Sequence, residues 1–386
     1  MLWRSILENL KQNALEIGSM QEKEEVDYRL VGKNVSLGKL KRKLSKKDFT
    51  DDINMRCHIV NVHRSLIQED LIKLFADPTV LQQELDWRVI DNCGRQEEGV
   101  GSGVQRDILA TFWKGIFAAL TVGDVEKAPC IRHDHQKTEW EAICRVLVYG
   151  FCFAGYIPIC LASCIFGEES ISKEDLLTSF MYYVTADDRE VLTKCLSGDF
   201  DCQDDDLLEL LSSYKCFKLP SKDNIKVLLM ELAHQEIIQK PRYVAQCWSP
   251  IISALKSDPP FCSVKSIKEL FLDLSPNAKK VIKALHPGVK SESEKQSFEF
   301  LKQFIKSLDR SSLKGFLKFV TGSDVLLKDQ KISVAFYVVD GSERRPIAHT
   351  CGPLLELPCT YQLYNELVEE FTSIMREKER RTFNIV

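Results

Sequence analysis

The sequence predicts an α+β protein in which a large, mostly helical N-terminal part precedes a small α/β part. Apolar residues recur at helical spacing along most of the chain, and only short stretches alternate as strands do. Ser275 and Pro276 form a strong signal for a new helix. With 386 residues, 44% of them hydrophobic, the chain is long enough for two or three domains. We therefore expect a charged leader or linker at 1–52, a helical domain at 53–274 and an α/β domain at 275–386.

Composition excludes several classes of protein. The formal net charge of −4 argues against a protein that coats nucleic acid. The first 17 residues mix apolar and charged side chains, so no export signal is predicted. Fourteen cysteines without such a signal indicate free thiols in a reducing compartment. A basic cluster at 39–47 suits a solvated linker or a nuclear signal, so we predict a cytoplasmic location or a nuclear one.

Metal and cofactor motifs are not found. The sequence contains no CxxC pair. Cys160 and Cys164 are not followed by histidine at ligand spacing, and the cluster of Cys130, His133 and His135 has no second half. We predict neither a metal site nor a cofactor.

The N-terminal elements begin after residue 53. A strand is predicted at 59–62 and a helix at 66–75. A glycine-rich stretch at 99–103 opens an amphipathic helix at 104–120. Such a loop can cradle phosphate, but the Lys-Ser/Thr pair of a phosphate loop is missing, so a tight turn before a buried helix is the better interpretation.

The longest apolar run, at 142–166, is about long enough to cross a membrane. Arg145 lies within it, and glycine and proline interrupt it near Gly155 and Pro158. We predict two core helices broken at that point and no membrane span. The acidic stretch at 199–209 is interpreted as the solvated start of a helix.

The C-terminal part alternates helices and a strand. Leu270 to Leu274 closes one helix, and Ser275-Pro276 is predicted to cap the next. An amphipathic helix at 298–308 and a further apolar segment at 313–320 precede a strand at 332–338, a turn at 340–341 and a last helix at 363–375.

The candidate nucleophile is Cys351, in a loop predicted between a strand and a helix. If the segment is extended, His349 projects to the same side, and Arg344 and Arg345 favour the reactive thiolate. No histidine follows Cys351, which excludes a papain-ordered dyad. Taken alone, such a cysteine is more often structural than catalytic.

Three motifs in order carry a family resemblance. A Phe-Val-Thr-Gly-Ser stretch at 319–323 is followed by Pro-x-Ala-His-Thr-Cys at 346–351 and by Leu-x-Leu-Pro at 355–358. Together they resemble the catalytic lobe of HECT-type ubiquitin ligases. Segments 62–66 and 98–107 are similar, more weakly, to the opening of the large HECT lobe. The resemblance implies a bilobal HECT-like fold, with the large lobe at 53–274 and the small lobe at 275–386.

The resemblance also implies a function. Cys351, in the triplet with His349 and Thr350, would accept ubiquitin as a thioester from a ubiquitin-conjugating enzyme and pass it to a substrate lysine. Phe383 falls where the family keeps a phenylalanine needed for the second transfer. The implied partners are ubiquitin, a conjugating enzyme and a protein substrate that the sequence does not identify. Glu356, Glu366 and the C-terminal carboxylate are candidate bases, and a joint at 273–276 would let the small lobe move.

Two departures keep other functions open. Gly352-Pro353 stands where the family usually has Phe-Asn, and the large lobe is shortened at 170–224, where the family docks its conjugating enzyme. The chain therefore resembles a divergent member with a shortened large lobe. The alternative is a catalytically weakened HECT-derived module that binds ubiquitin or another protein. A cysteine hydrolase acting on ubiquitin-like conjugates is a third reading.

Overall fold

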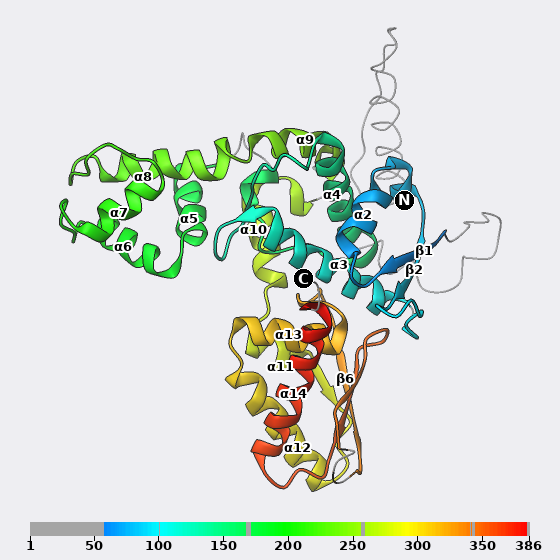
Figure 1. Ribbon diagram of the computed structural model, residues 1–386. Coiled ribbons are helices and arrows are strands. Elements are labelled where there is room, and N and C mark those ends of the chain that lie inside the picture. Colours follow the sequence, from blue (N-terminus) through cyan, green and yellow to red (C-terminus); the bar gives the residue numbers. More distant parts are fainter. Residues whose placement is uncertain are drawn as a thin grey trace.

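The computed structural model describes residues 58–99, 101–166, 171–255, 259–339, 341 and 344–383. The leader expected at 1–52 and its basic cluster lie outside this part of the chain. Buried apolar side chains form three separate clusters. Each cluster is the core of one of three units, which lie at different ends of the molecule (Figure 1). The protein is α+β and mostly helical, as predicted; the HECT-like bilobal arrangement stays a prediction.

The first unit holds the largest core. A parallel pair of strands, with His58 opposite Leu85, lies beside helices that bury three tryptophans. Trp248 donates from its indole nitrogen to the carbonyl of Trp140 at 2.8 Å, which satisfies a polar group inside the core. The main elements are β1 (His58–His63), α2 (Ile67–Phe75), β2 (Leu85–Ile90), α3 (Ser102–Ala119), α4 (Lys137–Tyr149), α9 (Arg242–Ile252) and α10 (Val264–Leu274).

The apolar run at 142–166 differs from its predicted form. Helix α4 ends at Tyr149 and continues as one π-helical turn, Gly150–Ala154, which Gly155 closes with a φ of 64°. Only a 3₁₀ turn, Ser163–Phe166, follows, so the predicted second core helix is wrong. Glycines and Pro158 supply the break, and no stretch remains that is long enough to form another helix. Among the described residues, no helix is both apolar enough and long enough to span a membrane.

The second unit is a small helical domain that projects from the first (Figure 1). Its helices α5 to α8 each begin at a clear boundary. Asp204 accepts from the backbone N–H groups of Asp206 and Leu207, so the acidic stretch caps a helix as predicted. The bounds are α5 (Lys173–Tyr183), α6 (Ala186–Ser197), α7 (Asp205–Ser213) and α8 (Ile225–His234).

The third unit packs helices against a four-stranded sheet of order β5-β6-β8-β7. Strands β5, β6 and β8 are parallel, whereas β7 is antiparallel to β8. Phe371 is fully buried, and its ring lies 5.0 Å from that of Phe304. The bounds are α11 (Ala278–Ala284), β5 (Leu285–Pro287), α12 (Glu292–Ser307), α13 (Arg310–Thr321), β6 (Ile332–Tyr337), β7 (Ile347–His349), β8 (Leu354–Pro358) and α14 (Tyr364–Phe383).

Several shorter elements complete the fold. They comprise the turns η2 (Pro78–Gln82), η6 (Gln235–Gln239), η7 (Ser253–Leu255) and η8 (Pro259–Phe261) and the paired strands β3 (Thr121–Val122) and β4 (Ala128–Pro129).

Two contacts of the connection after α13, made by Val325 and Leu326, hold the third unit against the first. Ser275 ends α10, and Asn277 caps α11 by accepting from the backbone of Lys280, so the predicted cap was two residues early. Beyond α13, the fully buried Val325 belongs to the core of the first unit. Leu326 N–H also donates to the carbonyl of Leu274 at 3.0 Å. The connection 322–327 therefore attaches the third unit to the first.

The turn predicted at 340–341 lies partly outside the described residues.

Candidate active site

Cys351 lies in a hairpin loop. Strands β7 and β8 pair through His349 and Leu354, so Thr350 to Pro353 form the connection. The loop had been predicted between a strand and a helix, but a second strand follows instead, because 354–358 joins the sheet beside β6. Ser333 N–H donates to the carbonyl of Pro353 at 2.9 Å and anchors the end of the loop. The side chain of Cys351 is exposed.

His349 faces a carboxylate across the hairpin. Its Nε2 lies 3.3 Å from Oε1 of Glu356, and both side chains are partly exposed. Extended backbone ends at His349, since Thr350 and Cys351 are in a turn. The condition for His349 and Cys351 to project to one side is therefore not met.

Of the two cations predicted near the sulfur, Arg344 is engaged by other groups. Arg344 Nε donates to Glu370 at 2.7 Å, and its guanidinium lies over the ring of Tyr361. Glu366 accepts from the backbone N–H groups of Leu363 and Gln362, and these bonds hold its pKa below the usual range. Glu366 and the residues that Arg344 contacts follow β8 in the chain, and the end of β8 lies roughly 13 Å along the strand from the hairpin loop. Of the two side-chain bases predicted, only Glu356 lies on the hairpin.

Burial distinguishes Cys351 from other cysteines. Burial raises the pKa of Cys195 to about 11, and it also raises the pKa of Cys144 and Cys247. Such thiols are protonated at neutral pH and react slowly. Among the described cysteines, the exposed ones are Cys93, Cys262 and Cys351.

The glycine-rich stretch before α3 lies against the hairpin. A Cβ added to Gly103 would lie 2.5 Å from the carbonyl carbon of Thr350, and one on Gly322 would lie 2.4 Å from the carbonyl oxygen of Gly103. Gly101, with a φ of 86°, is the N-cap of α3, and its added Cβ would be 3.7 Å from Sγ of Cys351. Three backbone segments therefore meet at distances that only glycine permits.

Arg106 crosses from α3 to the hairpin. Its Nη2 donates to the carbonyl of Thr350 at 2.7 Å and its Nε to the carbonyl of Thr321 at 2.9 Å. The side chain is buried, and burial lowers the pKa of Arg106. Ser102 Oγ lies 3.4 Å from the carbonyl of Cys351. Arg106 was missed as a site residue because no local pattern links it to a hairpin 244 residues away.

A charged network continues this contact. Asp107 lies 2.5 Å from Nη1 of Arg64 and 3.5 Å from Nζ of Lys318 on α13. Arg64 also binds both carboxylate oxygens of Glu97. Burial alone would lower the pKa of Arg64, but Glu97 and Asp107 raise it above its ordinary value. Lys318 donates to Thr111 Oγ1 at 2.8 Å, so side chains join α13 to α3.

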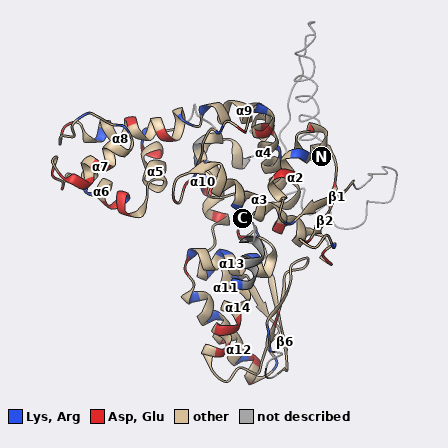
Figure 2. Ribbon diagram, viewed as in Figure 1, with Lys and Arg blue, Asp and Glu red and all other residues tan. Residues whose placement is uncertain are grey.

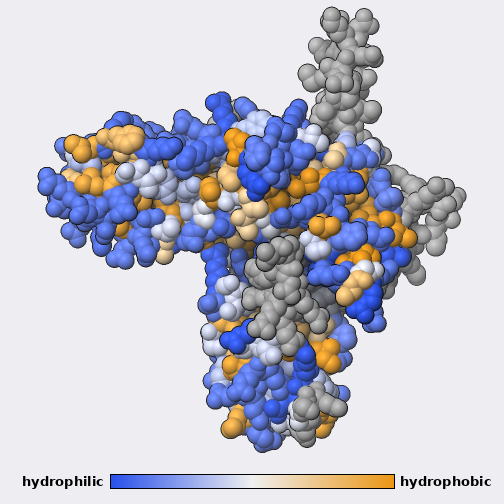
Figure 3. Space-filling model, in the orientation of Figure 1, coloured by the Kyte–Doolittle hydropathy of each residue, from blue (hydrophilic) through white to orange (hydrophobic). Residues whose placement is uncertain are grey.

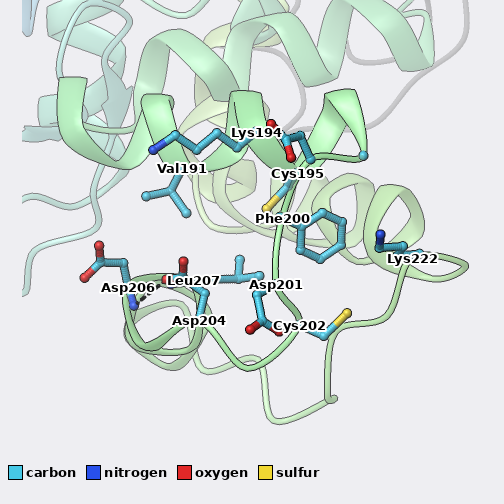
Figure 4. A pocket seen from close by; sticks show the side chains of 12 residues that line it. Val191, Lys194, Cys195, Phe200, Asp201, Cys202, Asp204, Asp206, Leu207 and Lys222 are labelled. Carbon is cyan, nitrogen blue, oxygen red and sulfur yellow. Dashed lines mark hydrogen bonds between the residues drawn. The ribbon is translucent and has the colours of Figure 1, made fainter.

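One cavity lies far from this chemistry. It has a volume of about 520 Å³ and opens between α6 and α7, with Cys195, Asp201 and Lys222 in its wall (Figure 4). Asp204 in the same wall is engaged as the cap of α7. No group of three potential ligands in the described part of the chain could hold a metal ion.

Phe383 is the last residue of α14. Helix α14 runs through the charged stretch 376–381, where a loosely held tail had been predicted. Figure 1 shows α14 running from the far end of its unit back toward the first unit. The Phe383 side chain lies outside the described part of the structure.

Comparison with known proteins places the hairpin in a family. Residues 269–386 match the family model of the HECT domain, described as a ubiquitin-transferase domain. The third unit is thus a HECT-type domain, and the resemblance predicted from the sequence is confirmed over this segment. The match includes His349, Thr350, Cys351 and Phe383, whereas the HECT-like reading of 53–268 stays a prediction. No curated protein matches the chain.

Proposed function

We propose that the protein is a ubiquitin-protein ligase that accepts ubiquitin as a thioester on Cys351 and transfers it to a substrate lysine. The observation that carries this proposal is the contrast between the cysteines of the HECT-type segment. Residues 269–386 contain Cys351 and Cys359. Cys351 is exposed at the turn of a hairpin, and Cys359 is 7% exposed. A nucleophile that meets a second protein must be accessible.

The first chemical step is a thioester exchange. The Cys351 thiolate attacks the carbonyl carbon of ubiquitin's C-terminal thioester on the conjugating enzyme. A new C–S bond forms, the bond to the donor cysteine breaks, and the donor leaves as a thiolate. Because one thioester replaces another, the free energy of the step is close to zero, and the protein mainly positions the sulfur.

The second step forms an amide. The lysine amine attacks the same carbonyl carbon, the C–S bond to Cys351 breaks, and the amine loses a proton. Among the candidate bases, Glu356 lies on the hairpin strand and is paired with His349. We propose that this pair accepts the proton, because a base must lie within hydrogen-bond reach of the group it deprotonates.

The conjugating enzyme is proposed to dock on the α5–α8 unit. This unit has its own core and projects from the rest of the molecule. Phe217 and Leu219, in the connection between α7 and α8, are 86% and 79% exposed. Apolar side chains are visible on its outer end in Figure 3. Figure 2 shows acidic residues on α6 and α7. Exposed large apolar residues with a charged rim are typical of a protein-binding surface.

Replacement of both Phe217 and Leu219 by serine should slow charging of Cys351. Loss of two apolar anchors would raise the concentration of conjugating enzyme needed for half-maximal charging by roughly tenfold or more. The rate is measured over a series of enzyme concentrations. Leu363→Ser, which changes a 66% exposed residue outside this unit, is the control. Equal charging curves for the double variant and the wild type would contradict this docking site.

The experiment that tests the proposed function is a charging assay. The purified chain is mixed with activating enzyme, ATP, conjugating enzymes and ubiquitin, and we expect an adduct that thiols cleave. Gly352-Pro353 favours a second candidate, a binding module that has lost transfer. That candidate requires ubiquitin binding in a pull-down without any thiol-sensitive adduct.

A further inference from the structure

We propose that the first turn of α3 is a docking cradle for the catalytic hairpin, in which Arg106 is a positioning residue for discharge of ubiquitin to lysine. This inference rests on the proposed function and assigns a role to a segment outside the matched HECT-type segment. Two features of the contact carry it: the space left by Gly103, and the pair of carbonyls held by Arg106.

The contact with the hairpin, and not the conformation of α3, explains why residue 103 is a glycine. It lies in the first turn of α3, and its φ is outside the left-handed range. Glycine in a helix costs about 1 kcal/mol relative to alanine, so alanine would suit the isolated helix better. An alanine Cβ, however, would lie 2.3 Å from Oγ1 and 2.5 Å from the carbonyl carbon of Thr350. A backbone carbon cannot move aside as a side chain can, so Gly103→Ala must separate the hairpin from α3.

Arg106 fixes the hairpin backbone beside the nucleophile. Both of its acceptors named above, the carbonyls of Thr350 and Thr321, belong to the HECT-type segment. Thr321 is the last residue of α13, where unpaired carbonyls and the helix dipole favour a cation. One guanidinium thus holds the end of α13 and the residue before Cys351 in a fixed relation, which a point charge such as Lys does less well.

The docked hairpin leaves the sulfur accessible. Cys351 is exposed. The residue of the glycine-rich stretch that lies nearest to Sγ is Gly101, and it has no side chain that could cover the sulfur. Docking therefore restrains the backbone of the loop without covering the nucleophile. This distinguishes positioning from autoinhibition, in which the sulfur itself would be covered.

The contact suits the second step better than the first. In the docked arrangement the hairpin lies on α3 of the first unit, while the proposed docking site for the conjugating enzyme is on the projecting α5–α8 unit (Figure 1). Val325, buried in the first core, and Lys318, beside Asp107, hold α13 against α3. A loaded hairpin held in this way presents a fixed thioester to an incoming lysine.

The test compares charging and discharge in single-turnover assays. Gly103→Ala should charge within about twofold of the wild type, whereas discharge to a lysine-bearing acceptor should slow by roughly tenfold or more, since misplacement by about 1 Å can cost about a hundredfold. Gly315→Ala makes the same change in α13, where an added Cβ meets nothing within 4 Å, and should leave both rates unchanged. X-ray scattering should show a larger radius of gyration for Gly103→Ala alone.

Arg106 variants supply a readout that a merely structural residue would not change. Arg106→Met should lower the maximal discharge rate while the acceptor concentration at half-maximal rate stays the same. Arg106→Lys should recover part of this rate. Wild-type discharge in Gly103→Ala, faster charging and discharge, or slower charging with normal discharge would each overturn the inference. A wild-type chain that forms no adduct would instead overturn the proposed function, and the discharge role with it.

Discussion

Replacement of Cys351 by alanine is expected to abolish the thiol-sensitive ubiquitin adduct completely. No methyl group can form a thioester, and the other cysteine of the HECT-type segment, Cys359, is buried. Because Cys351 is exposed, its truncation should change the free energy of unfolding by no more than about 0.5 kcal/mol. The adduct is measured on gels with and without reductant, and folding by thermal melting. Cys351→Ser should give at most a slow adduct that resists thiols, since an oxygen ester has replaced the thioester.

Exposure alone does not make a cysteine the carrier, so the control must also be an exposed thiol. Cys93→Ala, in the first unit, removes such a thiol and should leave charging unchanged. A normal adduct on Cys351→Ala, together with its loss in Cys93→Ala, would contradict the assignment. Cys359→Ala is a weaker control, because it opens space in a packed region and can lower stability.

Elements set by local periodicity were predictable from the sequence. Helices α2, α3 and α12 and strands β1 and β6 lie where apolar spacing placed them, whereas the apolar segment at 313–320 forms most of α13. Strand β2 was missed, although Leu85, Trp87 and Val89 alternate with less buried residues. Its parallel partner β1 lies more than twenty residues upstream, and no local pattern specifies such a pairing. The early cap at Ser275 has a local cause: a residue before proline avoids helical backbone, which suits the end of α10 as well as the start of α11.

The sequence predicted the part of the candidate site that contains Cys351, but not the part contributed by α3. The motif containing Cys351 could be recognised in sequence, but the hairpin that carries it required the pairing of β7 with β8. The glycine stretch at 99–103 was interpreted as a tight turn, and the positive φ of Gly101 agrees with a turn. The sequence does not indicate that Thr350 of the hairpin fills the space beside Gly103. Contacts between units depend on where each unit ends in space, and residue types alone do not encode that placement.

The C-terminal phenylalanine is expected to affect transfer much more than loading. In α14 the buried residues Leu367, Phe371 and Ile374 follow helical spacing. The same spacing leads next to positions 378 and 381, which are Lys and Arg, so Phe383 does not fall on this pattern. A core role for Phe383 is therefore not implied by the pattern. The direction of α14 returns the chain end toward the first unit (Figure 1). We propose that Phe383 fixes the position of the loaded domain during transfer.

Phe383→Ala should leave the thioester adduct nearly intact and lower the lysine-linked product by up to about a hundredfold, as expected when a reacting group is displaced by about 1 Å. The two steps are measured separately, by charging under non-reducing conditions and by discharge in a single turnover. Thr382→Ala changes the neighbouring residue of the same helix and should affect neither step. An equal decline of both steps with a lower melting temperature would instead identify Phe383 as a structural residue. An unchanged discharge rate would show that the family's role for this position does not extend to this chain. The expected loss is selective, because we propose that the aromatic ring acts only after ubiquitin has reached Cys351.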